Sequence, residues 1–316
     1  MRIFYSPKLL EFKGKFPDTP ERLKAILDGL RRCGLKFTIA PPKAATRKDL
    51  ERVHTRKYLD EIKHYKRIKA YFPDEPIDSH TYRCAALSAG AAISAAEYAV
   101  RHKKFAFALT RPKGNNAGRD FFGGYAYVNN VAVAVARLLA ENKAKRVLII
   151  DFDAHFCNGT NNIFRDDGRV WLLSFHQHAD SIYPYLGSER ESTARMRYCE
   201  NPLWMSDAEF VERFRKVLLE FSAQAKPDVI AVCAGFNTYY KDMFFGTVST
   251  VKQAQTYGKI GGAIRLCAER EKAAVFGVLE GGYWVEDLGE LVYNFLKAFT
   301  AGSAGAKELW DAKKRL

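Results

Sequence analysis

The chain has 316 residues, of which 47% are hydrophobic and 27% are charged, a composition typical of a globular protein with a substantial core. No apolar run reaches the roughly 18 residues that a membrane span needs, and the first residues lack a secretory signal pattern, so we expect a cytoplasmic protein with no membrane partner. The six cysteines form no CxxC pair, which argues against a zinc finger.

The net charge of +14 is concentrated near the start of the chain. Residues 1–70 contain 19 Lys and Arg against 8 Asp and Glu, and the densest segment, Arg56–Phe72, has aromatic residues between its bases. Such a segment could contact nucleic-acid phosphates without sequence preference. The alternative is a solvated helix face with no partner.

Apolar runs and helical patterns alternate along the chain. The runs are continuous rather than alternating with polar residues, which is typical of parallel strands covered on both faces. We therefore predict an α/β fold with a single doubly wound, mostly parallel sheet between two helical layers, formed by residues 1–300, and a tail at 301–316. The predicted strands are 1–5, 36–40, 104–110, 146–151, 170–175, 228–234 and 274–280, and the predicted helices are 19–33, 80–102, 128–143, 207–224 and 250–271.

Polar, glycine-containing segments follow five of these strands. They are RPKGNNAG, DFDAHFCNGT, SFHQH, AGFNTYYKD and EGGYW. Because ligands bind beyond the carboxyl ends of parallel strands, these segments predict one site at one edge of the sheet.

The strongest chemical pattern is Asp151-x-Asp153-x-His155. In an extended segment a spacing of two places the three side chains on one side. A carboxylate and an imidazole can share a metal ion such as zinc. The alternative is that these acids cap the following helix.

The motifs together resemble the histone deacetylase and acetylpolyamine amidohydrolase family, which has an arginase-like fold. The resemblance rests on five blocks in order: RP.G..A, RVLIIDFDAH…NGT, SFH, AGF and LEGGY. TPERLKAIL and FGGYAYVNNVAVAVARLL extend it, so that it covers about Tyr5 to Phe299.

The resemblance implies zinc-dependent removal of an acetyl group from lysine or a polyamine. Asp153 and His155 match two zinc ligands, but the third position holds Asn237, which brings no charge, so we expect weak zinc binding or none. Asp242 matches another acidic position of that loop and would rescue binding only if the loop shifted.

The positions of the family's catalytic His-His pair hold Asn115 and Asn116, which cannot act as general bases. Asn158 matches the partner of the second histidine, and Tyr283 matches the tyrosine that stabilises the oxyanion. Lys113, Phe156 and Cys157 also depart from the family pattern, which indicates natural drift rather than one engineered change.

Two further sets of residues follow from the resemblance. Asp151, Asp153, His155, Ser174 and Phe175 match a potassium-type site, which potassium or sodium could occupy; alternatively, Asp151 only braces the loop. Tyr125 and Tyr183 match the walls of the acyl-lysine tunnel, and Gly281 and Gly282 complete the substrate-binding set. The tyrosine hydroxyls could instead bond across the tunnel and close it.

These features support three interpretations of the function. The first is a non-catalytic pseudoenzyme or scaffold that binds an acylated lysine, a polyamine or a protein. The second is a metal-dependent amidohydrolase with altered chemistry, in which His176, His178, Cys157 or Tyr239 replaces the lost groups. The third is a nucleic-acid-associated protein that uses the basic N-terminal quarter.

Overall fold

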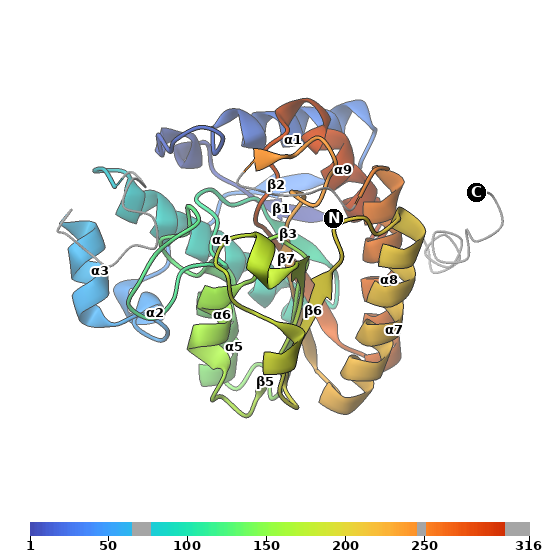
Figure 1. Ribbon diagram of the computed structural model, residues 1–316. Coiled ribbons are helices and arrows are strands. Elements are labelled where there is room, and N and C mark those ends of the chain that lie inside the picture. Colours follow the sequence, from blue (N-terminus) through green and yellow to red (C-terminus); the bar gives the residue numbers. More distant parts are fainter. Residues whose placement is uncertain (65–76, 245–250, 301–316) are drawn as a thin grey trace.

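The computed structural model describes residues 1–64, 77–244 and 251–300 (Figure 1). The predicted tail at 301–316 and the second half of the basic segment lie outside these ranges. No helix within the described ranges is long and apolar enough to cross a membrane.

The described residues form one eight-stranded sheet in the order β2-β1-β3-β8-β7-β4-β5-β6, and every neighbouring pair is parallel. The α/β prediction with a doubly wound sheet is confirmed. The strands are β1 (Arg2–Phe4), β2 (Thr38–Ala40), β3 (Ala106–Ala108), β4 (Val147–Asp151), β5 (Val170–Gln177), β6 (Met196–Asn201), β7 (Val229–Ala234) and β8 (Ala274–Leu279).

Helices cover both faces of the sheet. Figure 1 shows α1, α7, α8 and α9 on one face and α4 and α5 on the other. The helices are α1 (Glu21–Arg32), α2 (Arg47–Leu50), α3 (Arg56–Lys63), α4 (Thr81–His102), α5 (Asn130–Ala140), α6 (Asn158–Phe164), α7 (Asp207–Ala225), α8 (Gln255–Glu271) and α9 (Val285–Lys297).

The apolar strands separate two cores, as their continuous sequence pattern predicts. In β4, Val147 and Ile149 pack with α4 and α5, whereas Leu148 and Ile150 pack with α7, α8 and α9. This strand lies between β5 and β7 and carries the predicted metal motif at its end. The motif is therefore anchored by a strand whose residues are all buried.

Several elements were not predicted from the sequence, among them the short helices α2 and α6, strand β6 and helix α9. Strand β6, with the sequence MRYCEN, lies at the sheet edge and mixes charged and apolar residues, so it lacks the apolar run of a central strand. Helix α9 packs its apolar face against α1 and α8. Helix α1 begins at Glu21, two residues after the start of the predicted range, and Pro20 is its N-cap.

Candidate functional site

The loop after β4 forms the centre of the site. Asp151 ends β4 and is the register partner of Ser174 in β5 and Cys233 in β7. The Asp153 amide donates a hydrogen bond to Asp151 Oδ1, and the His155 amide donates to Asp153 Oδ1, both at 2.9 Å. This turn brings His155 Nδ1 to 3.2 Å from Asp153 Oδ1, so the predicted pair is adjacent.

Asn237 reaches the same point from the loop after β7. Its Oδ1 accepts a hydrogen bond from the Ala154 amide at 2.9 Å, and its Nδ2 donates to Asp153 Oδ1 at 2.8 Å. Nδ2 also lies 3.1 Å from His155 Nδ1. A backbone donor and a carboxylate acceptor thus fix the orientation of the amide, and its N–H groups face the two predicted metal ligands.

Lys113 extends from the loop after β3 into the same cluster. Its Nζ lies 3.4 Å from Asp153 Oδ2, and only 2% of the residue is exposed. Burial opposes the charge on Lys113, but the negative charges around it, Asp153 first, raise its pKa above the ordinary range. Burial likewise opposes the charge on Asp153, but Lys113 and hydrogen bonds hold the pKa of this carboxyl well below its usual value.

The N–H groups directed at Asp153 and His155 make this cluster a poor zinc site. Zinc needs lone pairs from nitrogen, sulfur or carboxylate oxygen, yet the Asn237 amide directs N–H groups at both Asp153 and His155. The Gly281 amide also donates to Asp153 Oδ2 at 2.9 Å. Within residues 1–64, 77–244 and 251–300, no three His, Cys, Asp or Glu side chains gather as a metal-binding group. With N–H donors directed at them, the side chains of Asp153, His155 and Asn237 as they stand do not fit the needs of a zinc ion.

The predicted potassium-type site remains a prediction. Asp151 and Ser174 are register partners, which suits an ion held between them. However, the Ser174 hydroxyl lies 3.0 Å from His176 Nδ1. The ring of Phe175 packs in the core against Phe214, with ring centroids 4.7 Å apart, so this residue could offer an ion only its backbone carbonyl.

Asn115 and Asn116 are both fully buried, and each is anchored through its Nδ2 group. Asn115 donates to Asp151 Oδ2 at 3.0 Å, and Asn116 donates to Asn158 Oδ1 at 2.8 Å and to the Phe156 carbonyl at 2.9 Å. Within the described part of the chain, their two Oδ1 atoms have no hydrogen-bond partner. The loop therefore holds two amides in fixed positions, each with a free acceptor.

The predicted tunnel walls lie beside this loop. Tyr125 is 9% exposed and Tyr183 6%, and the predicted oxyanion residue Tyr283 is 4% exposed. The Tyr183 and His155 rings have centroids 6.1 Å apart. A Cβ placed on Gly124, which precedes Tyr125, would lie 3.0 Å from Asn116 Oδ1 and 3.1 Å from a Tyr183 ring carbon. The free acceptor of the amide loop thus lies beside the predicted aromatic wall.

Arg22 positions the segment that carries Gly281, Gly282 and Tyr283. It donates to the carbonyls of Glu280 and Gly282, both at 2.6 Å, and pairs with Asp18 at 2.7 Å. Its guanidinium lies 4.6 Å from the centroid of the Tyr283 ring. Arg22 belongs to the motif TPERLKAIL but was not among the predicted site residues, although an arginine on the core-facing side of an amphipathic helix is itself a signal.

Glu280 was also missed as a site residue. Its Oε2 accepts hydrogen bonds from the amides of Gly114 (2.7 Å) and Asn115 (3.2 Å), so it braces the amide loop. Burial and the nearby Asp151 raise the pKa of Glu280 to about 8. The available signal was an acid that ends an apolar strand directly before two glycines.

The four residues that the second interpretation names as replacements are buried or lie beside a partner. His176 is buried between Ser174 and the Gly187 carbonyl, and burial lowers its pKa to about 4, which keeps the ring neutral. Burial raises the pKa of the Cys157 thiol, which opposes its action as a nucleophile. His178 lies near Glu200 at the surface, and the Tyr239 hydroxyl donates to Asp287.

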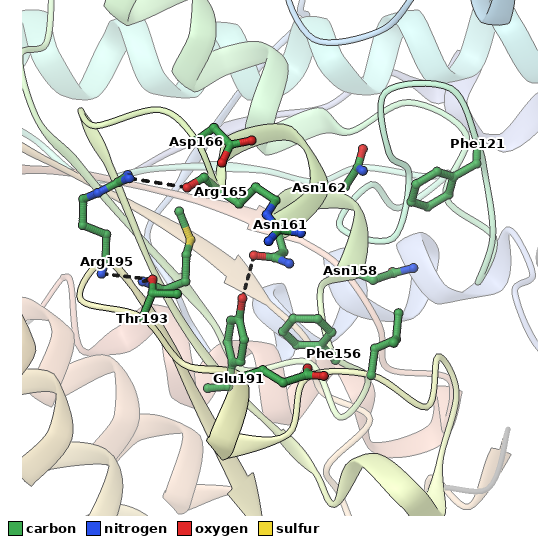
Figure 2. Close-up of a pocket in the computed structure, with 13 residues that line it drawn as sticks. Phe121, Phe156, Asn158, Asn161, Asn162, Arg165, Asp166, Glu191, Thr193 and Arg195 are labelled. Carbon is green, nitrogen blue, oxygen red and sulfur yellow. Dashed lines mark hydrogen bonds between the residues drawn. The ribbon is translucent and has the colours of Figure 1, made fainter.

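A separate cavity of about 550 Å³ borders the site through Phe156 and Asn158. Figure 2 shows residues of α6 on one side of it and Glu191, Thr193 and Arg195 on the other. The Phe156 ring packs edge-on against Tyr198, whose hydroxyl donates to Asn161. Phe156, which departs from the family pattern, thus forms part of the wall between this cavity and the amide loop.

Some bases of the N-terminal quarter form ion pairs. Just before the basic segment, Arg47 pairs with Glu51 at 2.7 Å and with Asp60 at 2.8 Å, and within the segment Arg56 pairs with Glu51 at 3.2 Å. Binding of nucleic acid by this region stays a prediction.

Sequence comparisons match most of the chain. The model of the histone deacetylase domain matches residues 16–299. An uncharacterized protein of Methanocaldococcus jannaschii is 30% identical over 98% of this chain and 89% of its own length. The acetylpolyamine amidohydrolase of Mycoplana ramosa is 33% identical over 70% of this chain and 64% of its own. The chain spans only 43% of the human polyamine deacetylase HDAC10, to which it is 28% identical.

Solved structures have the same architecture. The crystal structure of the HDA15 HD domain has a TM-score of 0.85 at 25% identity and covers 98% of this chain and 94% of that one. An acetylpolyamine aminohydrolase from Burkholderia pseudomallei has a TM-score of 0.83 at 24% identity, covering 95% and 99% of the two chains.

Proposed function

The chain belongs to the histone deacetylase family, and we propose that this member binds an N-acylated linear amine without hydrolysing it. The ligand class is an acetylated lysine side chain or an acetylated polyamine. Similar proteins bear the names polyamine deacetylase and acetylpolyamine amidohydrolase, which makes this class the natural one to test.

The observation that carries the proposal is the pair of anchored amides, Asn115 and Asn116. Hydrolysis of an amide needs a group that removes a proton from water and a group that gives one to the leaving amine. A carboxamide does neither near neutral pH. The positions that the resemblance gives to proton transfer are thus occupied by groups suited only to hydrogen bonding.

The free oxygens of these amides support recognition of an N-acyl group. A buried acceptor without a partner is rare and favours a ligand that supplies the donor. An N-acylated amine carries one N–H donor and one carbonyl acceptor. The N–H would face Asn116 Oδ1, which lies beside Tyr183, and the carbonyl would face the Tyr283 hydroxyl or the Lys113 ammonium.

Calorimetry on the full chain tests the proposal. An acetyl-lysine peptide and an acetylated polyamine would each be compared with the unacetylated compound, and mass spectrometry would follow both acetylated compounds for product. We expect binding of at least one acetylated ligand, weaker binding of its unacetylated form, and no product. The two ligands distinguish a protein partner from a small molecule.

Matched variants connect binding to the amide loop. Asn116→Leu keeps the approximate side-chain size and removes the acceptor, together with the Nδ2 donor to Asn158 and Phe156, which should weaken binding at least about tenfold. Gln224→Leu, at an exposed position of α7, should leave affinity unchanged. Turnover of either ligand that Tyr283→Phe abolishes would overturn the proposal and favour altered catalytic chemistry. Equal affinity for acetylated and unacetylated ligands would overturn the proposed ligand class.

A further inference from the structure

Two departures from the family pattern, Lys113 and Asn237, lie on the same carboxylate. Lys113 Nζ is 3.4 Å from Asp153 Oδ2, and Asn237 Nδ2 is 2.8 Å from Asp153 Oδ1. All three residues are at most 2% exposed. Each departure also changes charge: one adds a cation and the other replaces an anion with a neutral amide.

The two changes balance in charge. The family site implied by the motifs combines a divalent ion with two carboxylates and an imidazole, so its charges cancel. Here one carboxylate, Asp153, faces one ammonium, Lys113, and their charges also cancel. A buried carboxylate without a counter-charge is strongly unfavourable, so Asp153 requires one of these two arrangements.

We propose that the Lys113 ammonium is the permanent counter-ion of Asp153 and takes the place of the divalent metal. The protein thereby keeps the architecture of the site without binding zinc. This inference rests on the positions of three side chains and is independent of the ligand proposed above.

The two arrangements exclude each other. A divalent ion on Asp153 and His155 would face the positive charge of Lys113 and the N–H groups of Asn237. Removing Lys113 alone leaves those N–H groups. Replacing Asn237 by aspartate alone adds a second carboxylate but leaves the ammonium beside Asp153. Metal binding should therefore return only when both positions change.

Cobalt titration tests this on the full chain, because Co²⁺ at such a site gives visible absorption bands and needs no enzymatic activity. After treatment with chelator, we expect no stoichiometric binding by the native chain, by Lys113→Ala or by Asn237→Asp. The double variant Lys113→Ala/Asn237→Asp should bind one Co²⁺ per chain, and zinc should displace it. Lys104→Ala/Asn237→Asp, with the change at an exposed lysine, should behave as Asn237→Asp alone.

A folded double variant that binds no Co²⁺ would overturn the proposal, as would one Co²⁺ per chain on the native protein. If the double variant folds only when metal is added, metal-dependent refolding followed by circular dichroism is the readout, and failure to refold with metal counts against the idea.

A second measurement needs no variant with altered metal affinity. In ¹⁵N-lysine-labelled native protein, a buried ammonium should give a slowly exchanging side-chain resonance that zinc does not shift. Loss of that resonance on adding zinc would contradict the assignment.

Discussion

The buried pair of Lys113 and Asp153 makes a quantitative prediction for stability. Opposite unit charges 3.4 Å apart attract by about 5 kcal/mol at the effective dielectric constant of about 20 that suits protein sites. The amides of His155, Gly281 and Asn237 would still solvate Asp153 if the ammonium were removed. We therefore expect Lys113→Met to lower the free energy of unfolding by about 3 kcal/mol, the low end for breaking a buried pair.

A double-mutant cycle separates this pairing from loss of packing. In the Asp153→Asn background, Lys113→Met should cost less than about 1 kcal/mol, because the change then removes an ammonium that has lost its counter-ion. Urea unfolding followed by circular dichroism at pH 7 measures the four free energies. Lys104→Met, at the surface, should stay within about 0.5 kcal/mol of the native chain. An equal cost of Lys113→Met in both backgrounds would refute the pairing.

Three further predictions concern the scaffold around the site. Burial lowers the pKa of His54 to about 4, so the neutral ring stabilises the fold above pH 6.5, and up to about 3 kcal/mol of the free energy of unfolding is lost as the pH falls toward 4. His54→Gln should therefore flatten that part of the curve of urea midpoint against pH. An unchanged slope would contradict this. Arg22→Met should lower the free energy of unfolding in urea by about 3 kcal/mol, because it removes the hydrogen bonds to the Tyr283 segment and leaves the buried Asp18 with one partner fewer. Lys24→Met, at an exposed position of the same helix, should leave this free energy unchanged. Gly90→Ala should lower the melting temperature despite the better helix propensity of alanine, because its Cβ would overlap the Lys43 carbonyl of the facing loop. Gly168→Ala, with open space around it, should leave the melting temperature unchanged. Equal melting temperatures for the two variants would refute the clash.

The sequence contained enough to predict the architecture and the edge of the sheet where the site forms. Strand β4 reads as an apolar run because both of its faces are covered, and the acids at its end follow from that placement. Strand β6 was missed because an edge strand, with charged residues such as Arg197 and Glu200, carries no such run. Helix α9 had an amphipathic pattern that was not used.

The contacts within the site could be predicted only in part. The spacing of Asp153 and His155 predicts their adjacency, because local amide-to-carboxylate hydrogen bonds set it. The position of Lys113 depends on how the loop after β3 crosses the end of β4, which joins residues 40 positions apart. No periodicity encodes such a contact. A basic residue in a strand-end loop that otherwise resembles a catalytic one was the available signal.

The site residues that depart from the family pattern form specific contacts with one another and with the acids around them. Asn115 contacts Asp151, and Asn116 contacts Asn158, so both positions that the resemblance assigns to the His-His pair hold hydrogen-bonded amides, which do not transfer protons. Asn237 stands where the resemblance places an acid, and Lys113 supplies a cation that balances the charge on Asp153. Unpaired groups remain beside these contacts, because the Oδ1 atoms of Asn115 and Asn116 and the Nδ2 of Asn158 have no hydrogen-bond partner among the described residues. Buried polar groups are normally paired, so under the proposed function these three atoms are the positions at which a ligand would complete the hydrogen bonding.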